Sequence, residues 1–94
     1  MSVDVQTVRN DERSRYEGRL DGEVVTVLAF LRRGDVLDLT HTGTEPAFRG
    51  RGLASAVTQA ALDDVRERGE HVHPSCPFAV AFLDDHPEYA DLRV

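Results

Sequence analysis

The chain has 94 residues, enough for one domain with a modest hydrophobic core and too few for a second. Hydrophobic residues make up 40% and charged residues 30%, as in an ordinary globular protein. The formal net charge of −6 argues against binding to nucleic acid or to an anionic membrane, and it suits a cationic partner such as an amine. We therefore expect a single domain over residues 1–94. Because neither a membrane-spanning run nor a signal segment is recognisable, we expect it to be cytoplasmic.

The first half of the chain carries four β-strand patterns separated by turn signals. Asp21-Gly22 and Arg33-Gly34-Asp35 are typical of tight hairpin turns. The third pattern is apolar on both faces, so we expect it to lie centrally and to be covered on both sides. Together the four patterns predict an antiparallel meander. They cover residues 3–8, 14–20, 24–31 and 36–44.

The second half changes to helical periodicity. Leu53, Val57, Ala61 and Val65 recur at helical spacing, which predicts a helix from Gly52 to about residue 68. A fifth strand over residues 71–74, a second helix over 77–83 and a short tail from residue 86 follow. This order predicts a compact α+β domain.

The segment from Glu45 to Ser55 is the most informative part of the sequence. A helix start normally favours acidic residues, because its unpaired N–H groups carry partial positive charge. This helix start carries two arginines and two glycines instead. Glycines allow a close approach of the backbone, and arginines and N–H groups bind anions, so the segment predicts a phosphate or pyrophosphate site. The alternative is an ordinary strand-to-helix turn with solvated arginines.

Four sequence elements, read in order, resemble the GCN5-related N-acetyltransferases, and in particular their minimal single-domain branch. The pattern Arg49-x-x-Gly52-x-Ala54, placed between a strand and an amphipathic helix, resembles the family's acetyl-CoA-binding motif. The other elements, which lie before and after it, are His41-Thr42, Pro74-x-Cys76-Pro77-Phe78 and His86-Pro87-Glu88-Tyr89.

The resemblance implies a mostly antiparallel sheet with two main helices in α/β/α layers. It also implies acetyl-CoA as the cofactor, with the pyrophosphate on the glycine loop and the pantetheine arm along the end of the fourth strand. The residues that it assigns to acetyl-CoA are Thr42, Gly43, Thr44, Arg49, Gly50, Arg51, Gly52, Leu53, Ala54 and Ser55. The chain departs from the branch at one point: Gly43 stands where the branch usually has glutamate, and Glu45 lies two residues further on.

Two residues are candidates for catalysis. His41 is expected beside the thioester and could accept the proton of an attacking amine. Counted by alternation, it shares a face with Leu37 and Leu39, so it could instead be a hydrogen-bonded core histidine. Cys76 precedes Pro77 and so is expected at a helix N-terminus, where the helix dipole lowers a thiol pKa. It could accept the acetyl group, protonate the departing thiolate, or simply fill space in the core.

The resulting hypothesis is an enzyme that moves an acetyl group from acetyl-CoA to a primary amine on a small molecule or a peptide. We expect direct attack within a ternary complex. The short chain predicts an open acceptor side, which suits a peptide tail or an exposed amine, or which needs a protein partner or a second copy to complete it. The competing hypothesis is a non-catalytic acyl-CoA-binding module. No metal is expected, because His71, His73 and Cys76 do not complete a tetrahedral set.

Overall fold

The computed structural model describes residues 5–94, which form a five-stranded mixed sheet. The strands lie in chain order, and the first four are antiparallel neighbours while β5 runs parallel to β4. The α+β class and the meander are thereby confirmed. The start of the predicted strand over residues 3–8 lies outside the described residues. The strands are β1 (Gln6–Asn10), β2 (Arg15–Leu20), β3 (Glu23–Arg33), β4 (Val36–Thr44) and β5 (His71–Pro74).

Helices follow the fourth and fifth strands. The two α-helices of the described chain are α1 (Leu53–Glu67) and α2 (Pro77–Asp85). A short 3₁₀ helix, η1 (Pro46–Phe48), precedes α1, and a second, η2 (Pro87–Leu92), follows α2. Gly69 ends α1 with a positive φ of 71°, the left-handed cap that glycine favours. No helix within residues 5–94 is long and apolar enough to cross a bilayer.

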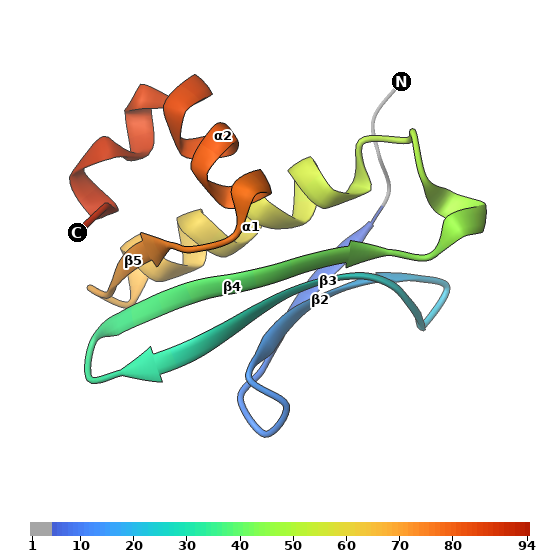
Figure 1. Cartoon of the computed structure of the whole chain (residues 1–94). Coiled ribbons are helices and arrows are strands. Elements are labelled where there is room, and N and C mark those ends of the chain that lie inside the picture. The colour runs from blue at the N-terminus through green and yellow to red at the C-terminus, as the bar shows by residue number, and fades with distance from the viewer. Residues whose placement is uncertain (1–4) are drawn as a thin grey trace.

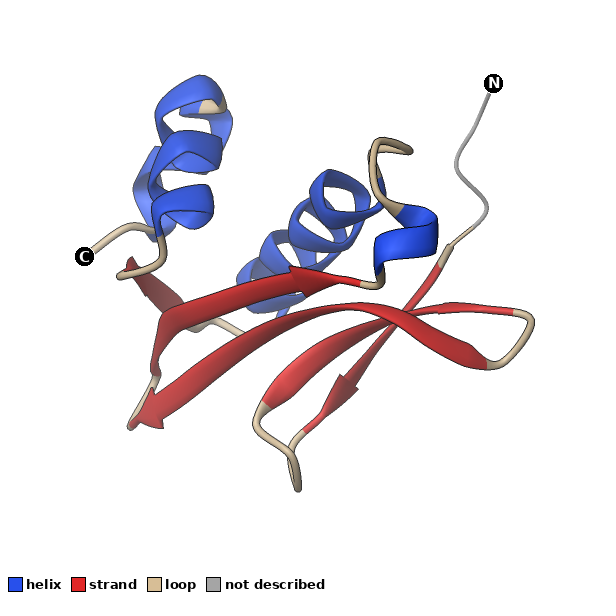
Figure 2. Ribbon diagram, turned by 45° about the vertical axis from the view of Figure 1, so that its right-hand side comes forward, coloured by secondary structure: helices blue, strands red, loops and turns tan. Residues whose placement is uncertain are grey.

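Both α-helices pack on the same face of the sheet (Figures 1 and 2). One hydrophobic core joins that face to the helices, with side chains from β2, β3, β4, α1 and α2. The expected α/β/α layering is therefore wrong for the described chain, which has two layers. The opposite face of β3 is only half covered, and Leu31 there is 54% exposed. The layering was implied by the family resemblance. The expectation that residues 24–31 are covered on both faces is wrong as well, since an apolar pattern does not show what covers a face.

A β-bulge in β4 decides which way its end faces. Ala29 pairs with His41 while the next residue, Phe30, pairs with Leu39, so Thr40 is an extra residue without a partner on β3. An extra residue shifts the alternation of side chains beyond it. As a result, Leu37 and Leu39 are buried in the core, whereas His41 is exposed. His41 is therefore not a core histidine.

Candidate functional site

The end of β4 leaves one backbone edge unpaired among the described residues. β5 pairs with β4 only as far as Leu39 and Pro74. The N–H groups of Ser75 and Cys76 then both donate to the carbonyl of Leu39, at 3.0 and 2.9 Å, and the chain turns away into α2. From Thr40 onward, β4 therefore borders a gap on the side where β5 would otherwise lie.

Thr42 and Thr44 turn their backbone groups toward this gap. Glu45 donates its N–H to the carbonyl of Val25 at 2.8 Å, so these two residues form a hydrogen-bonded pair. In an antiparallel ladder such pairs alternate with pairs whose N–H and C=O groups point outward. The pairs Thr26–Thr44 and Leu28–Thr42 are of the outward kind. Of these outward peptide groups, the Thr42 N–H is directed at the Cys76 thiol and the Thr44 carbonyl accepts from Arg49. The Thr42 carbonyl and the Thr44 N–H form no hydrogen bond within residues 5–94, so they could bind an extended ligand in the manner of a sheet strand.

The glycine loop leads into a helix start without an internal cap. Gly50 and Gly52 have positive φ values of 79° and 74°, and Gly52 is the N-cap of α1. The cap makes no side-chain hydrogen bond, and the first turn carries no acidic residue. Within residues 5–94, no acceptor takes the backbone N–H groups of residues 50–55. Such a row of free amides at a helix N-terminus is typical of anion sites.

A hollow of ≈ 210 Å³ lies directly at this helix start. It is lined by Thr44 from β4, by Phe78 from α2, and by residues 48–55 apart from Arg51. A Cβ added at Gly50 or at Gly52 meets no atom within 4 Å, so the backbone there faces open space. The end of β4, the glycine loop and α2 therefore surround one continuous site.

The two arginines of the loop are placed differently. The Nε of Arg49 donates to the carbonyl of Thr44 at 3.4 Å, so its guanidinium lies beside the hollow. Arg51 instead covers the ring of Phe48, with 5.2 Å from its Cζ to the ring centroid. Both side chains remain exposed and able to contact an anion at the helix start.

Cys76 lies where α2 meets the end of β4. It is the N-cap of α2, and its Sγ lies 3.5 Å from the Oγ1 of Thr42. Burial disfavours the thiolate, but the Thr42 hydroxyl and the backbone N–H groups of Ala79, Phe78 and Thr42 outweigh it. The pKa of the Cys76 thiol is therefore held below its ordinary value. This agrees with the location at a helix N-terminus that the sequence predicted.

We expect the thiol to ionise at a lower pH than a free cysteine, whose pKa is about 8.5. The ultraviolet absorbance of the thiolate, with Cys76→Ala as the blank, measures the midpoint directly because no other cysteine is present. Tyrosinates do not interfere, since burial raises the pKa of Tyr89 to about 12 and also raises the pKa of Tyr16. In Thr42→Val, which removes the hydroxyl beside the Cys76 sulfur, the pH midpoint of thiolate formation should rise. A wild-type midpoint at or above the free value would contradict this account.

His41 stands on the other side of β4. Its partner Ala29 lies on the face without helices, whereas Thr42 and Cys76 lie on the helix-covered face. The ring of His41 has no hydrogen-bond partner among residues 5–94, while the rings of His73 and His86 bond to backbone carbonyls. The two candidate catalytic side chains therefore approach the end of β4 from opposite faces.

The remaining histidines do not join Cys76. His73 bonds to the carbonyl of Val94, and the ring of His71 lies 3.8 Å from the carboxylate of Asp35. Across residues 5–94, no group of three His, Cys, Asp or Glu side chains is close enough to hold a metal ion.

Gly43 has a different place from the other residues predicted to bind the cofactor. Its carbonyl points toward β3, where it accepts from the Thr26 hydroxyl at 3.1 Å. It borders a separate hollow on the face without helices. Conversely, Phe78 lines the hollow at the glycine loop although the sequence assigned it no role there. The signal was its place at the second position of α2, directly after Cys76-Pro77 at the end of β4.

Comparison with known proteins points to one family. The family model described as GCN5-related N-acetyl-transferase matches residues 15–92. Protein NATD1 of Bos taurus is 33% identical over 84 residues, covering 85% of this chain and 74% of that protein. Protein NATD1 of Homo sapiens is 32% identical over 84 residues, with the same coverage of 85% and 74%.

Solved structures share the fold at low sequence identity. A GCN5-like putative N-acetyltransferase from Staphylococcus aureus superposes with a TM-score of 0.72 at 16% identity, covering 95% of this chain and 87% of that one. The ribosomal-protein-S18-alanine N-acetyltransferase of Escherichia coli superposes with a TM-score of 0.64 at 18% identity. That match covers 82% of this chain but 54% of the other.

Proposed function

We propose a function from the premise that the chain belongs to the GCN5-related N-acetyltransferase family: it binds acetyl-CoA and transfers the acetyl group to a primary amine. The observation that carries this proposal is the row of backbone N–H groups at residues 50–55 for which the described chain supplies no acceptor. A pyrophosphate supplies the acceptors that this row lacks. Bound there, acetyl-CoA provides an activated thioester to the end of β4.

Residues at the edge and on the two faces of β4 have different roles in the proposed transfer. The outward peptide groups of Thr42 and Thr44 hold and orient an extended arm along the gap. His41, on the open face, takes the proton that the attacking amine loses. Cys76, on the helix-covered face, gives a proton to the departing thiolate, for which its lowered pKa makes it a ready donor. Because the two residues lie on opposite faces, the amine enters from one side of β4 and the thiolate leaves on the other.

A second candidate function is a non-catalytic acyl-CoA-binding module. It is favoured by one observation, namely that Gly43 supplies no carboxylate at the position where the branch usually has glutamate. This module would use the same glycine loop and the same free edge of β4. It differs from the enzyme only in having no acceptor.

Release of free CoA thiol from acetyl-CoA, with and without a panel of primary amines, tests the proposal. We expect at least one amine to accelerate thiol release well above the rate in buffer. If acetyl-CoA binds and no amine accelerates thiol release, the chain is a non-catalytic acyl-CoA-binding module and not an acetyltransferase.

Substitution of Cys76 tests whether it donates a proton during direct attack or carries the acetyl group itself. We expect Cys76→Ala to slow transfer by roughly 100-fold, because it removes a positioned proton donor, while acetyl-CoA affinity stays nearly unchanged. Cys76→Ser, which keeps a hydroxyl, should slow transfer less. Intact mass spectrometry of the wild-type protein with acetyl-CoA should find no lasting acetyl mass. An acetyl mass that Cys76→Ala lacks would replace direct attack by an acetyl-enzyme, and full activity of both variants would make Cys76 structural.

A further inference from the structure

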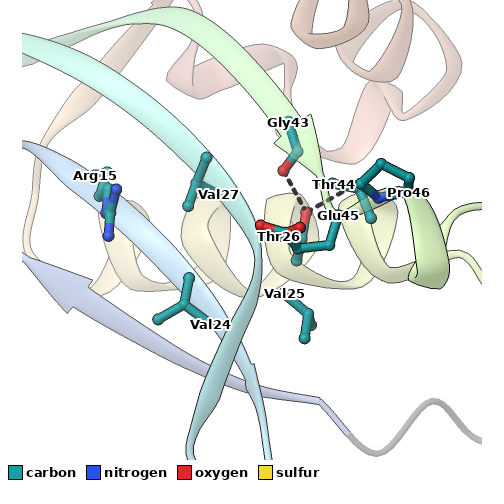
Figure 3. A pocket seen from close by; sticks show the side chains of 9 residues that line it. All are labelled: Arg15, Val24, Val25, Thr26, Val27, Gly43, Thr44, Glu45 and Pro46. Carbon is teal, nitrogen blue, oxygen red and sulfur yellow. Dashed lines mark hydrogen bonds between the residues drawn. The ribbon is translucent and has the colours of Figure 1, made fainter.

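A second hollow, of ≈ 420 Å³, opens on the face of the sheet that carries no helix. It lies at the ends of β3 and β4, and its lining includes Arg15, Val25, Val27, Gly43 and Glu45. Figure 3 shows Gly43, Thr44 and Glu45 on one side of it and Arg15 on the other, with Val27 between them. Thr44 borders both this hollow and the one at the glycine loop, so the end of β4 is the wall that the two share.

The strand register brings these side chains together on one face. Arg15 pairs with Ala29, which pairs with His41. Two residues before Ala29 on β3, Val27 pairs with Gly43 on β4. Paired residues in a sheet share a face, so all four side-chain positions belong to the face that carries no helix. They are Arg15, Val27, Gly43 and His41.

Gly43 makes room beside the ring of His41. A Cβ built on Gly43 would lie 3.2 Å from the Nε2 of His41. The Nε2 of His41 therefore borders the space left by the missing side chain, and an amine that rests against Gly43 can approach Nε2 and pass its proton to it. A side chain at position 43 would instead fill the space and press against the ring.

The two ends of the hollow carry opposite charge. At the β2 end, Glu17 is 2% exposed and accepts from Arg15 at 2.8 Å and from Arg19 at 2.6 Å, so the cluster keeps one net positive charge. Arg15 makes its hydrogen bond to Glu17 through Nε, and its terminal nitrogens form no hydrogen bond within residues 5–94. At the β4 end, Glu45 is exposed and forms no ion pair within the same residues. Valines form the floor between the two ends.

We propose that this hollow is the acceptor site of the acetyl transfer proposed above, and that the acceptor is a small ω-amino acid. Its amine lies over Gly43, between His41 and Glu45, its methylene chain crosses the valine floor, and its carboxylate binds the terminal nitrogens of Arg15. Two strand spacings of about 4.8 Å separate β2 from β4, and the long arginine side chain shortens that span, so a spacer of roughly three to five methylene groups fits.

Binding of 5-aminopentanoate, compared with pentylamine, tests the proposal in the wild-type protein without acetyl-CoA. In a ¹⁵N-resolved NMR titration, we expect 5-aminopentanoate to shift the amide signals of Val27, Gly43 and Thr44. We expect it to bind at least about tenfold more tightly than pentylamine, because a charge-assisted bond to Arg15 is added. Transfer from acetyl-CoA should show the same preference in kcat/KM.

Two matched variants assign the preference to one side chain. Arg15→Gln should reduce the affinity for 5-aminopentanoate to that for pentylamine, whereas Arg13→Gln should leave both unchanged. Arg13 lies in the β1–β2 turn, outside the hollow, and its substitution changes the net charge equally. Equal binding of the two amines by the wild type, or shifts confined to another part of the sheet, would overturn the proposal.

Failure of the acetyl transfer itself has a different signature. It appears as absence of acetyl-CoA binding and of thiol release with every amine tested. The NMR titration contains no acetyl-CoA, so the two failures are read separately. Transfer to amines without preference for a distant carboxylate overturns the acceptor assignment and leaves the enzyme standing.

Discussion

Gly52→Val is expected to weaken acetyl-CoA binding by at least about 100-fold, the equivalent of two charge-assisted hydrogen bonds. Gly52 is the N-cap of α1 and has a φ of 74°, and the space that a Cβ would enter is open in this structure. A branched side chain there stands where a pyrophosphate must approach the free amides of residues 50–55. It also strains the backbone, at a cost of about 1–2 kcal/mol for a left-handed conformation.

Gly34→Val is the matched control for that strain. Gly34 has a φ of 64°, a Cβ there also meets no atom within 4 Å, and it lies in the turn before β4, at the opposite end of that strand from the glycine loop. Thermal unfolding should show similar losses of stability in both variants. Calorimetric titration should show loss of binding in Gly52→Val alone. If Gly52→Val binds acetyl-CoA as tightly as Gly34→Val does, the anion site is not at this loop.

His41→Ala is expected to lower kcat for acetyl transfer by about 10²–10⁴-fold, which is the usual contribution of a positioned general base. Its Nε2 faces the space above Gly43, and its ring has no partner among residues 5–94 that would give it a structural role. Affinity for acetyl-CoA should not change, because His41 lies on the face opposite to Cys76. Added imidazole should restore part of the lost rate to His41→Ala.

Thr40→Ala is the control for disturbance of the bulge. Thr40 is the neighbouring bulge residue and is exposed as well, but it offers no base. It should keep nearly the full rate and show no response to imidazole. A His41→Ala protein that transfers acetyl groups at the wild-type rate would remove His41 from the mechanism.

The boundaries of several elements could be read from the sequence because turn residues mark them. The fourth strand, over residues 36–44, and the fifth, over 71–74, were predicted with the bounds that the structure has. Glycines at positions 34, 52 and 69 all have positive φ, and each stands at the end or beginning of an element. The glycine loop was singled out in the same way, since its glycines and arginines are in conflict with an ordinary helix start. The binding roles of its residues stay predictions.

Two features of the site could not be predicted, because they depend on packing and pairing between strands. The extra residue Thr40 leaves no trace in the alternation of apolar residues, yet it moves His41 from the core face to the open face. The hollow between Arg15 and Glu45 exists because no helix covers β3 on that side and because position 43 has no side chain. Local pattern cannot report the absence of a covering layer.

The last turn of the chain was missed for a different reason. The segment from residue 86 was taken as a tail, but it forms η2, in which Tyr89 and Leu92 are buried. The hydroxyl of Tyr89 donates to Asp63 of α1 at 2.7 Å, so η2 is fixed against the helix that carries the glycine loop. A proline at the helix start and two apolar residues three apart were the signals that could have predicted it.

The proposed function depends on the binding of the acetyl-CoA pyrophosphate by the free amides at the start of α1. Calorimetric titration of the wild-type protein with acetyl-CoA and with CoA tests it most directly. We expect saturable binding of both ligands, with one molecule per chain, since both carry the pyrophosphate. Absence of binding by either ligand would contradict it, and the glycines at residues 50 and 52 would then serve only to turn the chain from β4 into α1.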